Sequence, residues 1–179
     1  MTGAGRVYGE ALYALAKEEQ LTKTVLEQLH LLQDVFHGEP DYLRLLDNPV
    51  LSKDQRCKLL DESFRGKVHA YVLNFLKLLV EKDHIRQYPH CVTSFQDLYY
   101  EDNQILPVCA TTSVALSQEQ SDRLAKKLAG LTGKQILLSN KVDANVLGGV
   151  CLNYDSKRID DTVAHRLEDI KNLLVNTVL

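Results

Sequence analysis

Residues 101–114 read EDNQILPVCATTSV, and the hydrophobic pattern of the chain changes within this stretch. Before it, apolar residues recur at the three- and four-residue spacing of α-helices, whereas the β-branched residues from Ile105 to Val114 are typical of a strand. The polar run and Pro107 interrupt the helical pattern, so a domain boundary is expected here. The sequence therefore predicts an α+β protein, with a six-helix bundle in residues 1–104 and a small α/β domain in residues 105–179.

Short turn signals divide the first of these parts into helices. Ser52 is a good N-cap, and Gln55 three residues later completes a capping box for the fourth helix, which ends at Gly66. Pro40 opens the third helix, and Pro89 falls in the first turn of the sixth, where the missing N–H of proline costs least. Six short helices within such a length are typical of a compact bundle.

The second part combines strands with helices. After the first strand, Ser117 and Gln120 form another capping box, which opens a helix. Residues 135–142 and 149–154 are expected to form the next two strands.

A last helix is expected at the C-terminal end, capped by Asp160 or Asp161. The predicted order of the second part is therefore strand, helix, strand, strand, helix. The apolar face of the last helix would hold Val163, Leu167, Ile170, Leu174 and Val178.

Composition excludes several classes of function. The chain has 179 residues, of which 45% are hydrophobic and 25% charged, as in an average globular protein. Its net charge is -3 and it has no Trp, so it offers neither the basic patch nor the aromatic platform of a nucleic-acid binder. No apolar run is long enough to span a bilayer, and the N-terminus resembles no signal or transit segment. We expect a protein that works in the cytoplasm or on a cytoplasmic surface.

Two glycine-rich segments resemble phosphate-binding motifs but lack their context. In GAGRVYG, residues 3–9, the last glycine spacing is one residue too long for a dinucleotide fingerprint, and no strand precedes it. In GLTGKQ, residues 130–135, Gln135 replaces the Ser or Thr that would bind magnesium. We interpret the second segment as a tight turn between a helix and a strand.

The sequence contains no catalytic or cofactor motif that we can identify. Its four cysteines lack the two-residue spacing of zinc or redox sites, so we interpret them as small core residues in a reducing compartment. A thiol or metal enzyme would rest only on His90 and Cys91, which point in different directions on a helix. We therefore predict no catalytic residue, no metal and no cofactor.

The first and fifth helices carry more apolar surface than one core contact requires. Ala11, Leu12 and Leu15 recur around the first helix, and Val72 and Leu76 are among the apolar residues of the fifth. Such helices either lie at the centre of the bundle or leave a groove for an amphipathic helix of a partner. The periodicity leaves both interpretations open.

Several blocks of sequence, in order and over nearly the whole chain, resemble the delta subunit family of F-type ATP synthases. The blocks are RVYGEALYALA at 6–16, DNPVLS at 47–52, NFLKLL at 74–79, and VDANVLGGV at 142–150 followed by IDDTV at 159–163 and an Arg166-Leu167 pair. The mitochondrial counterpart is the oligomycin-sensitivity-conferring protein. This chain departs from the family pattern at Asp83-His84, where Gly-Arg is common, and at Asp161-Thr162, where Gly-Ser is usual.

The resemblance implies a non-catalytic stator subunit, present in one copy, that links the alpha/beta catalytic head to the peripheral stalk during proton-driven ATP synthesis. Residues 1–104 would receive N-terminal helices of alpha subunits between the first and fifth helices, and residues 105–179 would bind the C-terminal ends of b subunits. The protein would lie on the cytoplasmic face of a bacterial cell membrane without inserting into it. The alternative is a free-standing helical-bundle adaptor unrelated to ATP synthase.

The resemblance also implies particular residues. Four residues of a structural motif are carried over, Asp143, Gly148, Gly149 and Asp160, and the glycine pair would allow close backbone approach at the start of a strand. The residues that would line the alpha-binding groove are Tyr8, Ala11, Leu12, Leu15, Val72, Leu76 and Leu79.

Overall fold

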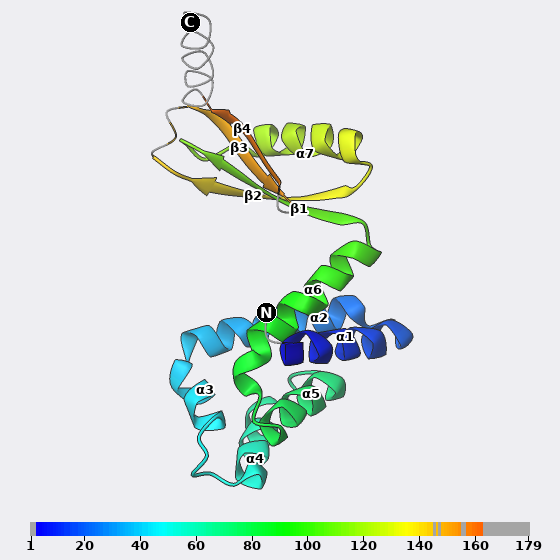
Figure 1. Cartoon of the computed structure of the whole chain (residues 1–179), viewed down its shortest axis with the longest axis vertical. Helices are drawn as coiled ribbons and strands as arrows, with labels where there is room; N and C mark the ends of the chain where they lie inside the picture. The colour runs from blue at the N-terminus through cyan, green and yellow to red at the C-terminus, as the bar shows by residue number, and fades with distance from the viewer. Residues whose placement is uncertain (1–2, 145, 147, 155–156, 163–179) are drawn as a thin grey trace, which may run out of the picture. The chain divides into compact units, whose positions relative to one another are not determined.

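The computed structural model describes residues 3–144, 146, 148–154 and 157–162 (Figure 1). The chain divides into two compact units between Tyr100 and Glu101. The first unit contains helices only, and the second contains a sheet of four strands, so the fold is α+β. Among the described residues, no helix is both long and apolar enough to span a lipid bilayer.

Two helices of the first unit begin at the residues that the sequence analysis identified, Pro40 and Ser52. The side chain of Ser52 accepts from the N–H of Gln55 while the side chain of Gln55 accepts from the N–H of Ser52, so this capping box is confirmed. Pro40 occupies the first turn of its helix, as predicted, and a short 3-10 helix that was not predicted precedes the last one. The bounds are α1 Gly3–Glu18, α2 Thr22–Gly38, α3 Pro40–Leu46, α4 Lys53–Phe64, α5 Ala70–Glu81, η1 Ile85–Gln87 and α6 Tyr88–Asp102.

One apolar core joins these helices. Tyr88 at the start of α6 is almost fully buried, and its hydroxyl donates to the carbonyl oxygen of Leu29 in α2 at 2.8 Å. Its ring packs edge-on against Phe36, with 5.1 Å between ring centroids. Satisfying the one polar atom of a buried tyrosine avoids the cost of an unpaired hydroxyl, so this contact fixes α6 against α2.

Glycines bring α1 close to α6. A Cβ atom placed on Gly9 would lie 2.6 Å from the carbonyl oxygen of Cys91, and one on Gly5 would lie 2.8 Å from the Cβ of His90. Since atoms at such distances overlap, only glycine permits this approach of the two helices. The glycine-rich segment at residues 3–9 is therefore part of helix α1, and its glycines allow α1 to pack closely against α6.

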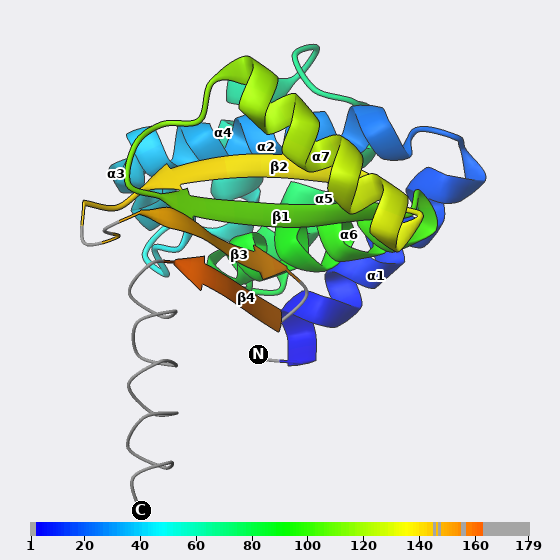
Figure 2. The same ribbon diagram turned by 90° about the horizontal axis from the view of Figure 1, so that it is seen from above.

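The second unit is a four-stranded sheet with the strand order β2-β1-β3-β4. β1 Ile105–Thr112 runs parallel to β2 Gln135–Val142, and β3 Gly149–Tyr154 and β4 Lys157–Thr162 add antiparallel partners. Parallel neighbours need a crossover connection, which α7 Gln118–Thr132 supplies. Figures 1 and 2 show α7 lying along one face of the sheet, and its apolar side chains pack on a small core of Leu106, Val108, Ala110 and Leu152.

Three turns of the second unit lie where the sequence analysis singled out residues. The predicted capping box of Ser117 and Gln120 opens α7. Gly133 ends the helix at a φ of +69°, so the glycines of residues 130–135 belong to the turn between α7 and β2. Gly149, predicted to allow close backbone approach, begins β3 at a φ of +87°, a conformation that favours glycine.

The predicted cap at Asp160 or Asp161 is wrong. Both residues lie in β4, where Asp160 pairs with Cys151 and Asp161 with Val150 of β3. β4 escaped prediction because Ile159 is its only large apolar residue, so the sequence shows no strand alternation; hydrogen bonds to β3 form the strand instead. The predicted helix at residues 163–178 lies outside the described residues.

Candidate functional site

An apolar groove lies between α1 and α5, with a cavity of about 280 Å³. Each wall shows side chains at positions i, i+3, i+4 and i+7, which is the spacing of one face of a helix. The lining residues are Tyr8, Ala11, Leu12 and Leu15 from α1 and Tyr71, Asn74, Phe75 and Leu78 from α5.

The α1 wall consists of the four residues that the resemblance implies for this helix. Leu12 is only 5% exposed and also belongs to the core, whereas Leu15 is 37% exposed and Ala11 is open to solvent. The four residues that the resemblance implies lie on one face of α1, and in the structure that face lines the groove.

The α5 wall differs from the expectation. Val72, Leu76 and Leu79 are each 0% exposed in the core, so they cannot line an open groove. The groove is lined instead by the adjacent face of α5, about 100° around the helix axis. The sequence signal for this second face was the unusual width of the apolar surface on α5, since two adjacent faces of the helix are largely apolar.

Histidines lie at the two ends of α5, beside the groove tyrosines. The ring of His84 lies 5.9 Å from that of Tyr8, and the ring of His69 lies 5.0 Å from that of Tyr71. His69 is the N-cap of α5, and its Nδ1 accepts from the N–H of Tyr71 at 3.3 Å. This cap satisfies one of the free N–H groups at the start of the helix and so orders the end of the α5 wall.

A carboxylate lies beside one end of the groove. The negative charge of Glu19, which follows α1, and burial raise the pKa of the Tyr71 phenol, whose hydroxyl bonds to that carboxylate. Since Glu19 follows α1 and Tyr71 begins α5, the two helices run in opposite directions along the groove. Tyr8 beside His84 marks the other end.

The buried Arg56 of α4 forms an ion pair with the more exposed Asp83, the second residue after α5. The guanidinium of Arg56, 4% exposed, donates to the carbonyl oxygen of Leu46 at 3.1 Å and to the carboxylate of Asp83 at 2.9 Å. Hydrogen bonds from Lys53 and Arg56 lower the pKa of Asp83. Asp83 has a φ of +56°, a backbone conformation that favours glycine. No pattern identified in the sequence analysis predicts this ion pair.

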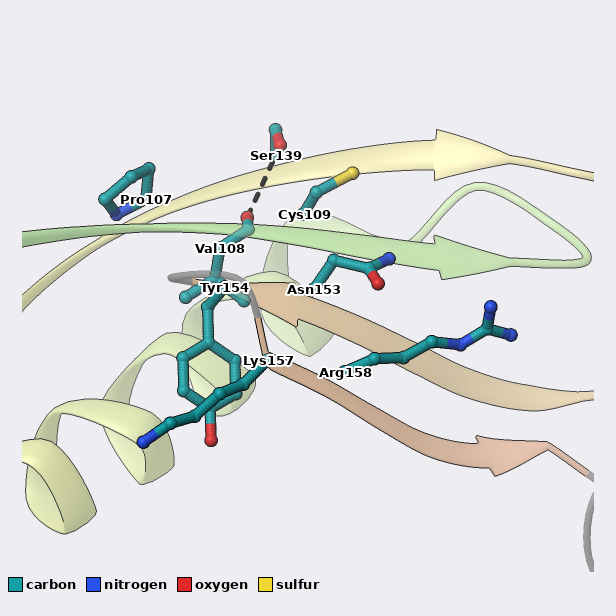
Figure 3. Close-up of a pocket in the computed structure, with 8 residues that line it drawn as sticks. All are labelled: Pro107, Val108, Cys109, Ser139, Asn153, Tyr154, Lys157 and Arg158. Atoms are coloured by element: carbon teal, nitrogen blue, oxygen red, sulfur yellow. Dashed lines mark hydrogen bonds between the residues drawn. The ribbon is translucent and has the colours of Figure 1, made fainter.

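A second cavity, of about 440 Å³, lies on the sheet (Figure 3). Its charged residues do not converge: Figure 3 shows Lys157 and Arg158 pointing in different directions, and Arg158 donates to Asp160 at 2.6 Å. Asp160 of the predicted structural motif is thus an ion-pair partner within β4. Asp143, also of that motif, follows β2, and its N–H donates to the carbonyl oxygen of Thr112 at 2.9 Å.

Of the two residues considered for a thiol or metal enzyme, Cys91 belongs to the core and His90 is exposed. Cys91 is 1% exposed, and burial raises the pKa of its thiol to about 11, so the thiol stays protonated near neutral pH. His90 packs against Gly5 of α1. In the described part of the chain, no three His, Cys, Asp or Glu residues are grouped to hold a metal ion.

Comparison with known proteins identifies the family. A sequence model described as the ATP synthase delta (OSCP) subunit matches residues 4–174. ATP synthase subunit delta of Chlorobium chlorochromatii is 31% identical over 96% of both chains, and that of Lactobacillus gasseri is 31% identical over 94% of this chain and 92% of the relative.

A solved structure has the same fold. A chain in the Toxoplasma gondii mitochondrial ATP synthase hexamer superposes with a TM-score of 0.74 at 19% identity, covering 96% of this chain and 97% of that one. Together with the match over residues 4–174, the sequence relatives establish that this chain belongs to the ATP synthase delta (OSCP) subunit family.

Proposed function

We propose that the protein is the non-catalytic stator subunit of an F-type ATP synthase, and that it links the alpha/beta catalytic head to the peripheral stalk during proton-driven ATP synthesis. Family membership supports this role. The structural observation that supports this role most strongly is the open apolar groove between α1 and α5. A free-standing adaptor is not favoured, because the family match extends over residues 4–174.

In this proposal the six-helix bundle of residues 1–104 binds the head. Two antiparallel helix faces with the same side-chain spacing form a surface that a third helix can fill, because ridges of side chains on one helix pack into the spaces on others. The proposed occupant is the N-terminal helix of an alpha subunit, which would cover Tyr8, Ala11, Leu12 and Leu15. On α5 it would contact the wall of Tyr71, Asn74, Phe75 and Leu78 in place of the buried Val72, Leu76 and Leu79.

Residues 105–179 bind the C-terminal ends of b subunits in the same proposal, with one copy of the protein in each complex. The family match supports this assignment, since it continues through the second unit. The protein would then be held peripherally at the cytoplasmic face of the bacterial cell membrane by its partners.

Titration calorimetry of the full chain with a synthetic peptide of the alpha-subunit N-terminus tests the proposal. We expect stoichiometric binding, which Ala11→Asp weakens about tenfold or more because a carboxylate would enter an apolar contact. Ala14→Asp is a matched control, since Ala14 is an exposed residue of the same helix outside the groove. Absence of binding by the unaltered chain, or equal losses from the two substitutions, would contradict the proposed role of the groove.

A further inference from the structure

One carboxamide lies among the apolar side chains of the groove. Asn74 stands on the α5 wall, one helical turn from both Tyr71 and Leu78. It is exposed, and its side chain makes no hydrogen bond with any other residue in the described part of the chain. Asn74 is therefore a polar group that the fold itself leaves unused on an otherwise apolar surface.

A helix bound in the groove would remove this carboxamide from water. An apolar side chain opposite Asn74 would leave its donors and acceptor unpaired, which costs far more than the bond itself contributes. A side chain with a hydrogen-bonding group at the same place would satisfy them. A single buried Asn fixes the register of helices in coiled coils for this reason.

The carboxylate of Glu19 beside one end of the groove adds a second constraint. Glu19 lies beside Tyr71, and Asn74 is one turn from Tyr71 along α5. Charge complementarity therefore favours an occupant with positive charge at that end, supplied by a basic side chain or by the N-terminus of its helix.

We infer that Asn74 sets the register of the helix that binds between α1 and α5. The occupant is an amphipathic helix whose apolar stripe contains one hydrogen-bonding side chain opposite Asn74 and whose end beside Tyr71 is positively charged. This inference rests on the proposed function, which identifies the occupant as the alpha-subunit N-terminal helix. The apolar walls supply contact area, and Asn74 rejects helices shifted along the groove.

A double-mutant cycle tests the register. The full chain and its Asn74→Leu variant are titrated with the alpha N-terminal peptide and with peptides in which each polar residue is replaced singly by Ala. One of these Ala replacements is expected to weaken peptide binding to the unaltered chain about tenfold, because the complex then buries the Asn74 amide without a partner. The same replacement is expected to weaken binding to the Asn74→Leu variant less than about twofold, because that variant has no amide to bury. Thr24→Leu is the control, since Thr24 is an exposed polar residue of α2 outside the groove.

The charge constraint is tested by salt. Glu19→Gln is expected to weaken binding about threefold at low ionic strength and to leave it unchanged at high ionic strength. An unchanged affinity at low ionic strength would overturn the assigned polarity of the bound helix.

The outcomes separate this inference from the proposed function. If the peptide binds but no position couples to Asn74 in either Asn74→Leu or Asn74→Ala, the register role is overturned and the head-binding role stands. If the peptide does not bind the unaltered chain, the head-binding role fails and the inference fails with it. Circular dichroism verifies that the variants are folded, which is expected because Asn74 is exposed.

Discussion

Gly9 places the backbones of two helices in contact. Its missing side chain leaves room for the carbonyl oxygen of Cys91 and the Cβ of Ser94, which would lie 2.6 and 2.7 Å from an added Cβ. The backbone oxygen cannot rotate away as the end of a flexible side chain could. The position therefore tolerates no larger residue without movement of α1 away from α6.

Gly9→Ala is expected to lower the free energy of unfolding by about 1–3 kcal/mol, because overpacking outweighs the higher helix propensity of alanine. Urea denaturation followed by circular dichroism measures the change. Gly130→Ala in α7, where an added Cβ meets nothing within 4 Å, is the control and is expected to be neutral or stabilising. A neutral Gly9→Ala would show that α1 and α6 can separate at little cost.

Single residues also show how far the groove could be predicted. On α1, Leu12 lies between the core and the groove, so one apolar stripe predicts both contacts. On α5, the neighbouring residues Tyr71 and Val72 are both apolar, but only Val72 points into the core. Hydrophobicity alone cannot decide between adjacent faces of such a helix, because the choice depends on which neighbouring helices cover it.

Among the elements, α4 and α5 are joined through Asp83, the second residue after α5. Asp83 receives hydrogen bonds from Lys53 and Arg56, and the buried Arg56 also binds the end of α3. A buried guanidinium without its carboxylate is strongly destabilising. The pair therefore holds three helical segments in place.

Asp83→Asn is expected to destabilise the protein at neutral pH, with a pH dependence that follows from the charge. The pKa of Asp83 is lowered in the folded state, so its carboxylate stabilises the fold above the unfolded-state pKa of about 4, and this contribution is lost as the pH falls through the lower folded-state value. The difference between the unaltered chain and the variant should shrink below about pH 4.

Urea denaturation at several pH values measures this difference. Asp34→Asn on α2 is the control, because Asp34 is exposed and makes no ion pair within the described residues. If the difference in unfolding free energy between the unaltered chain and Asp83→Asn stays constant down to low pH, the charge of Asp83 does not stabilise the buried Arg56.

The elements that the sequence predicted are those with local signals. Ser52 and Ser117 begin their helices through hydrogen bonds to residues three positions away, so short sequence patterns contain the information. β4 is different, because its backbone hydrogen bonds to β3 stabilise a strand whose side chains are mostly charged. Pairing of this kind is invisible to hydrophobic periodicity, and the aspartates of β4 therefore resembled a helix cap.

For the whole molecule, each unit has its own apolar core. Leu32 belongs to the core of the first unit and Val108 to that of the second. Leu32 is 0% and Val108 1% exposed. The division between Tyr100 and Glu101 lies four residues before the boundary predicted between residues 104 and 105.

Two unfolding transitions are therefore expected in differential scanning calorimetry. Leu32→Ala should lower the stability of one transition by about 2–5 kcal/mol and leave the other unchanged, since a buried leucine is lost from one core only. Val108→Ala should lower only the other transition, by a smaller amount because fewer buried atoms are removed. A shift of both transitions by either substitution would show that the units unfold together.

The contact of Gly5 and Gly9 with α6 also has a kinetic consequence. Because α1 is fixed against α6 and α5 is fixed by its buried stripe, both walls of the groove exist before any ligand arrives. The occupant alone then becomes ordered on binding, and association requires no rearrangement of the protein. Changes to the groove should accordingly alter the lifetime of a complex much more than the rate at which it forms.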